Sequence, residues 1–391
     1  MKIMQGEADF DFSGKRDVFV KLSATACLLS VLFVGLFGLN FGIDFAGGYE
    51  LQVEFPKDFQ ENEVKDLLAP LGLSEVRVQR FGGRDSRQAL IMIREQGSLD
   101  ETKKAQVRAG LEAIAGGAQG ILNWVMAESG ESITVQFGKP VGEGELETLV
   151  AGLNLKTKNI LKRGRDDKPE YQVEIVSVAG LIESALRAGY EVPESQAMIQ
   201  RAEYVGPHVG EELRNQGVLA IIYALGFILI YVAIRFDLAF APGAIIALLH
   251  DVLITIGVFA LFQIEFNLPI IAAILTVVGY SLNDTIVVYD RIRENALRFK
   301  GRPATELVNS SVNQTLSRTL LTSVTTLLVV AALLLMGGGI IRDFSIALAI
   351  GVIVGTYSSV GVAAMTYEVI RERQEGKTPA TNERRKVATA H

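Results

Sequence analysis

Six long apolar stretches constrain this chain more than any other feature of its sequence. A helix needs roughly 20 mostly apolar residues to cross about 30 Å of hydrocarbon. The stretches cover residues 18–39, 217–234, 238–262, 268–289, 319–336 and 344–367. Apolar residues make up 49% of the 391, and their gathering into runs indicates membrane helices and not a water-soluble core. The sequence therefore predicts a polytopic α-helical membrane protein with six transmembrane helices.

The first stretch is too long for the apolar core of a cleaved signal peptide, so we read it as a retained helix. The single cysteine, Cys27, lies within it, which excludes an intramolecular disulfide. The predicted parts are a cytoplasmic N-terminus (1–17), a first transmembrane helix (18–40), a water-facing domain (41–215), transmembrane helices 2 to 6 (216–370) and a cytoplasmic basic tail (371–391).

The orientation follows from the lysines and arginines near the helix ends. They gather before the first stretch, between the fourth and fifth, and after the sixth, whereas the opposite short connections, 263–267 and 337–343, contain only Arg342. Positively charged flanks stay in the cytoplasm. We therefore expect both termini to be cytoplasmic and the long loop at 41–215 to be extracytoplasmic.

The long loop reads as an α+β domain that repeats itself. Residue patterns predict strands at 51–55, 76–80 and 89–93, with helices at 61–71 and 99–114. A similar order recurs about 82 residues later, which predicts ferredoxin-like β-α-β-β-α repeats at about 49–116 and 131–190. The alternative is that two ordinary α+β stretches share common patterns by chance.

Neither copy contains a phosphate loop, a metal-spaced His/Cys set or a nucleophile elbow. The chain also lacks a basic patch interleaved with aromatic residues, and its net charge of −6 mixes a membrane part with a water-facing part. We therefore expect no enzymatic chemistry, no metal, no cofactor and no nucleic-acid partner. The domain is expected to bind or move something.

Charged residues are rare inside the last five stretches, where each is costly and marks a bundle interior or an ion path. Asp284 lies about five residues, roughly 8 Å, from the end of the fourth stretch, and Arg318 comes directly before the fifth. The two can therefore meet at one depth. Burial and a nearby guanidinium act in opposite directions on the proton affinity of a carboxyl group, so the pair is a candidate for proton coupling. The alternative is a static ion pair that holds two helices together.

A supporting polar track is predicted from polar side chains at helical spacing. Its candidate members are His250, Asp251, Thr276, Tyr280, Asn283, Thr322, Thr325 and Thr326. One alternative is that the threonines bond only to their own helices. Another is that the His250–Asp251 pair satisfies backbone groups freed by Pro242 and Gly243.

Several motifs resemble those of SecF proteins in the SecD/SecF family of the bacterial Sec system. The matching segments are residues 41–48, 205–213, 247–251, 279–295, 313–319, 322–326 and 355–359. The likeness covers the first helix with its exit, and then about residues 204–370 almost continuously. Many long matches in the right order make this resemblance highly specific.

The resemblance implies a subunit that pairs with SecD, whose six helices complete a twelve-helix bundle similar to resistance-nodulation-division transporters. It implies a bacterial inner-membrane location beside the SecYEG channel, where the proton-motive force promotes translocation and release of secreted proteins on the periplasmic side. YajC, translocating preproteins and membrane lipids are further implied partners.

The family's membrane aspartate and arginine correspond to Asp284 and Arg318. The helix-exit motif corresponds to Asp44, Gly47 and Gly48, which we read as a hinge because glycine accepts backbone angles that other residues avoid. The water-facing loop is longer than the single ferredoxin-like domain usual in the family, and the extra length coincides with the second predicted copy. Two competing hypotheses are half of a small-molecule or lipid exporter, and a scaffold that stabilises the channel.

Overall fold

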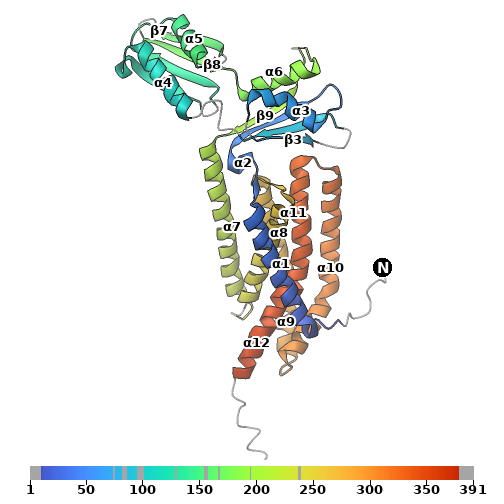
Figure 1. Ribbon diagram of the computed structural model, residues 1–391. Coiled ribbons are helices and arrows are strands. Elements are labelled where there is room, and N and C mark those ends of the chain that lie inside the picture. The colour runs from blue at the N-terminus through green and yellow to red at the C-terminus, as the bar shows by residue number, and fades with distance from the viewer. Residues whose placement is uncertain are drawn as a thin grey trace, which may run out of the picture. The chain divides into compact units, whose positions relative to one another are not determined.

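A computed structural model describes residues 10–73, 75–81, 86–94, 101–127, 130–153, 157–165, 168–193, 195–236 and 239–377. The chain forms two compact units, one within residues 1–40 and 216–391 and the other within 41–215. The first contains most of the apolar helices, and the second contains both larger β-sheets (Figure 1).

Six helices in the described part of the chain are long and apolar enough to cross a membrane, which confirms the six predicted spans. Their bounds are α1 (Arg16–Phe37), α7 (Pro207–Arg235), α8 (Ala241–Phe262), α9 (Leu268–Arg298), α10 (Ala304–Met336) and α11 (Gly339–Ser358). The last helix continues through a π-helical turn, Ser359–Ala364, into α12 (Met365–Lys377).

Two helices extend well beyond the predicted apolar stretches. The 31 residues of α9 and the 33 residues of α10 correspond to about 46 and 50 Å at 1.5 Å per residue, more than the hydrocarbon core requires. Asn267 caps α9 by accepting a hydrogen bond from the backbone N–H of Ile270. Because α10 begins at Ala304, Arg318 lies inside this helix and not at its beginning.

Glycines allow the central helices to approach closely. A Cβ atom added at Gly351 in α11 would lie 2.1 Å from Cγ2 of Val277 in α9, and one added at Gly355 would lie 2.9 Å from Cβ of Ser281. Gly351 and Gly355 therefore permit close packing of α11 against α9. Helix α9 also packs against α8 and α10.

The second unit contains two four-stranded antiparallel sheets, each with its own core (Figure 1). The first sheet has the order β3-β4-β2-β9, from β2 (Gly48–Glu54), β3 (Val76–Phe81), β4 (Gln88–Ile93) and β9 (Ile199–Val205). The helices α3 (Glu61–Leu68) and α6 (Val178–Tyr190) complete its core. Along the chain these elements run β-α-β-β-α-β, the order of ferredoxin-like folds.

The second sheet has the order β5-β6-β8-β7, from β5 (Ile121–Met126), β6 (Ser132–Phe137), β7 (Thr157–Arg165) and β8 (Lys168–Ile175). Its core is completed by α4 (Glu101–Ala115) and α5 (Glu143–Gly152). The chain also contains two short strands, β1 (Asn40–Phe41) and β10 (Glu265–Phe266), and the four-residue helix α2 (Ile43–Ala46).

Each core combines elements from both predicted repeats. The helix α4 lies in the first predicted repeat, 49–116, yet its Val107 and Leu111 are buried in the core of the second sheet. The helix α6 lies in the second predicted repeat, 131–190, yet its Ile182 and Leu186 are buried in the core of the first sheet. The compact modules therefore differ from the predicted repeat boundaries, and the duplication itself stays a prediction.

Candidate functional site in the membrane helices

The two charged residues singled out in the sequence lie on neighbouring helices in different environments. Asp284 of α9 is 2% exposed, and its Oδ2 has no hydrogen-bond partner among the described residues. Arg318 of α10 is exposed on the surface of the chain. No ion pair joins them in the part of the chain that the structure describes, although the charge of Arg318 acts on the Asp284 carboxyl group. The pair is therefore not locked by direct contact.

The polar side chains near this pair divide into two groups. Thr276 and Asn283 of α9 are exposed, as is Thr325 of α10, so these residues meet whatever covers the two helices. Tyr280 is half-buried, and its hydroxyl group has no partner among the described residues.

The four threonines hydrogen-bond to carbonyl groups of their own helices. The hydroxyl of Thr276 donates to the carbonyl of Ala272 at 2.8 Å. Those of Thr322, Thr325 and Thr326 donate to carbonyls three or four residues earlier in α10. Their donors are satisfied locally, as one alternative expected, which leaves the hydroxyl lone pairs as acceptors.

The His250–Asp251 pair lies in a second cluster that joins three helices. Asp251 of α8 is fully buried, and its Oδ2 accepts hydrogen bonds from Ser281 of α9 at 2.5 Å and Ser358 of α11 at 2.7 Å. Its Oδ1 lies 2.9 Å from Nδ1 of His250. The carboxyl group of Asp251 thus bonds to side chains, and within the described part of the chain it has no bond to backbone groups near Pro242.

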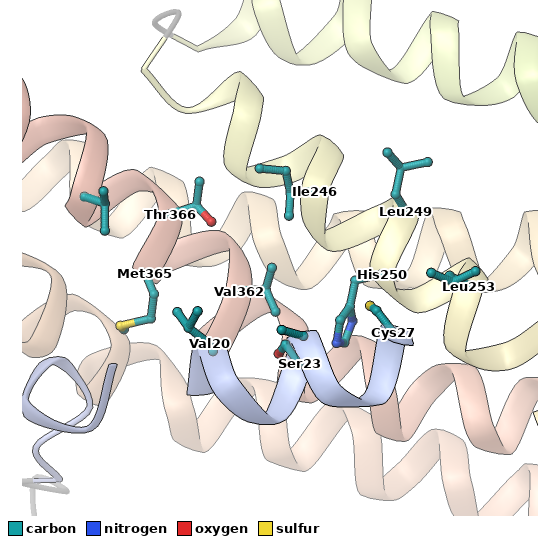
Figure 2. A pocket seen from close by; sticks show the side chains of 13 residues that line it. Val20, Ser23, Cys27, Ile246, Leu249, His250, Leu253, Val362, Met365 and Thr366 are labelled. Carbon is teal, nitrogen blue, oxygen red and sulfur yellow. The ribbon is translucent and has the colours of Figure 1, made fainter. Parts of the chain in front are cut away.

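His250 lines a largely apolar cavity of about 470 Å³ between α1, α8 and the π-helical turn with α12 (Figure 2). Its ring is 5% exposed, points towards Ser23 and Cys27 of α1, and its Nε2 has no partner among the described residues. The ring also lies 6.0 Å from that of Tyr357, whose hydroxyl is 2.9 Å from the hydroxyl of Ser23.

The buried polar residues that were not singled out in the sequence include Ser281, Ser358 and Glu368. Ser281 and Ser358 bind Asp251, but an isolated serine in an apolar helix gives no signal by itself. Glu368 in α12 is fully buried and accepts hydrogen bonds from Ser13 at 2.6 Å and Arg16 at 3.0 Å. Its position directly after the predicted sixth span made it resemble an ordinary flanking charge.

The predicted hinge residues occupy a tightly packed turn at the beginning of the second unit. Asp44 lies in α2, and Gly47 and Gly48 follow with φ values of +75° and +128°. A Cβ atom at Gly48 would lie 2.2 Å from the carbonyl oxygen of Ile93. Both the backbone angle and the space therefore require glycine at position 48. Whether the turn acts as a hinge stays a prediction.

Among the described residues, no group of three or more His, Cys, Asp or Glu side chains is arranged to hold a metal ion. The chemistry available at Asp251, His250, Asp284 and Arg318 is that of two buried carboxyl groups, an imidazole and an exposed guanidinium. Such groups can exchange protons and change their pairing.

Comparison with known proteins places this arrangement in one family. Residues 188–373 match the model of the SecD/SecF protein export membrane protein C-terminal region, and residues 33–56 match the model of the SecD/SecF GG motif. The chain is 40% identical to the protein translocase subunit SecF of Magnetococcus marinus over 366 residues, which cover 93% of each protein. It is 33% identical to SecF of Koribacter versatilis, covering 97% of this chain and 98% of that protein.

The fold is also similar to a solved structure. The crystal structure of SecDF from Thermus thermophilus, a translocon-associated membrane protein, matches with a TM-score of 0.63 and 30% identity. The match covers 96% of this chain but only 40% of the SecDF chain. Full-length similarity to SecF proteins, together with the six spans and both matched motifs, shows that the chain belongs to the SecF family of protein translocase subunits.

Proposed function

We propose that this chain acts with SecD as a proton-driven accessory subunit of Sec protein export. An accessory role in Sec export follows from family membership. The finer proposal is that proton-motive force drives movement that promotes translocation and release of secreted proteins on the periplasmic side of SecYEG. Both termini are then cytoplasmic, and residues 41–215 are periplasmic.

The observation that carries the proposal is the environment of Asp284. A carboxyl group that is 2% exposed within membrane helices, with one oxygen unpartnered among the described residues, is costly to keep charged. It is stabilised by taking up a proton or by approach of the Arg318 guanidinium. Because those two events compete, protonation can change which neighbour the carboxyl group engages. This is the physical basis for coupling.

Exposed polar residues on the membrane helices support the proposal that a partner covers them. Arg318, Thr276 and Asn283 are exposed on membrane helices, where polar groups without cover are unfavourable. The chain matches 40% of the SecDF chain. We therefore propose that SecD covers this polar surface and completes the walls of the proton path. SecYEG, YajC, translocating preproteins and membrane lipids are the further proposed partners.

The test is Asp284→Asn in cells depleted of the native protein, with export of a secreted reporter as the readout. We expect the variant to copurify with SecD in wild-type amounts but to lose proton-dependent export. Asp290→Asn is the matched control, because it makes the same chemical change on the same helix at an exposed position. Normal export by Asp284→Asn would refute the proposal and favour a scaffold role. Intact export with a defect in drug or lipid transport would favour an exporter.

A further inference from the structure

The two sheets of the second unit present four edge strands, and one of them differs from the others. β3 and β9 are the edges of the first sheet, and β5 and β7 are the edges of the second. An edge strand offers a row of backbone N–H and C=O groups to any extended chain, so proteins commonly guard edges with charged side chains.

Three of the four edges carry such guards. The charged residues are Arg77 and Arg80 in β3, Arg201 and Glu203 in β9, and Lys158, Lys162 and Arg163 in β7. The sequence of β5 is Ile-Leu-Asn-Trp-Val-Met, with neither a charge nor a proline. Leu122 and Val125 of this strand are 50% and 58% exposed. Within the described residues, β5 is therefore an unguarded edge with apolar side chains on its surface.

The register shows which backbone groups of β5 face outwards. The N–H of Ala127 donates to the carbonyl of Ser132 at 3.0 Å, and Val125 stands opposite Thr134. Hydrogen-bonded pairs alternate along an antiparallel ladder, so Val125 also directs its backbone groups to β6. The backbone groups of Trp124 and Met126 then face away from β6. The register shifts between Ile121 and Asn123, whereas residues 123–126 pair regularly with β6.

The side chains of β5 reinforce this arrangement. Trp124 and Met126 pack against the core of the second sheet, and the guanidinium of Arg108 in α4 lies 5.9 Å from the Trp124 ring centroid. Their packing fixes the strand while their backbone groups stay on the outer edge. A chain added here would gain main-chain hydrogen bonds from a strand that is already ordered, without paying to order it.

We propose that the outer edge of β5 binds an extended segment of unfolded polypeptide as an added strand, an inference that rests on the proposed role in protein export. Strand addition takes its affinity from main-chain hydrogen bonds, so it tolerates many sequences. Leu122 and Val125 add apolar contacts. Because β5 carries no charge, it favours uncharged segments, whether their side chains are polar or apolar. An unfolded chain in transit presents such segments before it folds.

The test measures binding of one unfolded polypeptide to the full-length protein in lipid nanodiscs without a proton gradient. The probe is fluorescein-labelled α-lactalbumin that has been reduced and carboxymethylated, and the readout is fluorescence anisotropy. Leu122→Lys/Val125→Lys adds guards to the β5 edge, and we expect at least tenfold weaker binding. Asn159→Lys is the matched control, because it adds a lysine at an exposed position of the opposite edge strand, β7. We expect it to bind as the unmodified protein does.

Site-specific crosslinking keeps the test decisive if the double variant is unstable. A benzoylphenylalanine at position 125 is expected to crosslink to the probe, whereas one at position 159 is not. Equal binding by all variants, no binding by the unmodified protein, or crosslinking from 125 only to a second copy of the chain would overturn the proposal. Asp284→Asn should bind the probe normally, so failure of strand addition and failure of proton coupling are distinguishable.

Discussion

Replacement of Asp251 tests whether its cluster holds the membrane helices together by hydrogen bonding or by charge. The carboxylate accepts two serine hydroxyl bonds on Oδ2 and lies within hydrogen-bond distance of His250 on Oδ1, so it connects α8, α9 and α11. In Asp251→Ala all three contacts are lost, and Ser281 and Ser358 lose their interhelical partner. In Asp251→Asn the side-chain oxygen can still accept from both serines, and its amide can donate to Nδ1 of His250.

The expected costs differ several-fold. A hydrogen bond between membrane helices contributes about 0.6 kcal/mol on average, whereas one to a charged group contributes about 1.5–3 kcal/mol. Three contacts place the loss in Asp251→Ala at about 2–9 kcal/mol. Asp251→Asn can keep all three contacts, so we expect it to lose less than about 1 kcal/mol.

The assay is unfolding by SDS in mixed micelles, followed by the loss of helical circular dichroism and extrapolated to zero SDS. Both variants are compared with the unmodified protein under the same conditions. The reasoning is refuted if Asp251→Asn is as destabilising as Asp251→Ala, because the charge and not the hydrogen-bond geometry would then dominate. If Asp251→Ala lowers the free energy of unfolding by less than about 0.5 kcal/mol, the cluster does not connect the helices, since even one average membrane hydrogen bond contributes more than that.

Three further perturbations test the second unit. In a thermal unfolding assay, Gly48→Ala should destabilise this unit by at least about 1–3 kcal/mol, because the positive φ strains alanine and its Cβ meets a carbonyl oxygen of β4. The control Gly144→Ala lies in open space within α5 and should be neutral or stabilising in the same assay. Burial, and then two neighbouring carboxylates, raise the pKa of Glu50 above its ordinary value of 4.5. The stability that this group contributes is therefore greatest below pH 4.5 and is lost as pH rises through the raised pKa, so Glu50→Gln should raise Tm at pH 8 and leave it unchanged at pH 4. Leu111→Ala and Leu186→Ala should each destabilise the protein by about 2–5 kcal/mol. Limited proteolysis should show that Leu111→Ala opens the module of the second sheet and that Leu186→Ala opens the module of the first sheet. The predicted repeats would give the opposite assignment.

The sequence predicted the membrane helices because hydropathy is a local signal. It missed the polar beginning of α10, since residues 304–318 contain no long apolar run although they continue the same helix. For the same reason Arg318 was placed directly before a span, whereas it lies within α10. Among the polar residues, Asp251 and Asp284 were found because a carboxylate is rare in a membrane span. Ser281 and Ser358 were not found, because their role depends on a partner in another helix.

The second unit shows a different limit. Strands β2, β3 and β4 were predicted to within a few residues, whereas β5, β7 and β9 were not. Basic residues recur through β7 and hide its alternation. The pairing of α4 with the second sheet and α6 with the first depends on contacts between residues far apart in the chain. Periodicity identifies such helices but cannot assign them to a sheet.

The two buried aspartates of the membrane unit show why residue type alone does not assign function. Asp251 has contacts on both oxygens and connects three helices, so its hydrogen-bonding capacity is already used in packing. Asp284 is equally hidden, but its Oδ2 has no partner among the described residues, and its cationic neighbour is exposed and not bonded to it. A saturated carboxylate stabilises one arrangement, whereas an unsatisfied one gains free energy from whichever proton or cation reaches it. Replacing Asp251 by Ala should therefore weaken folding, whereas neutralising Asp284 by Asn should leave stability largely intact and remove the response to protons.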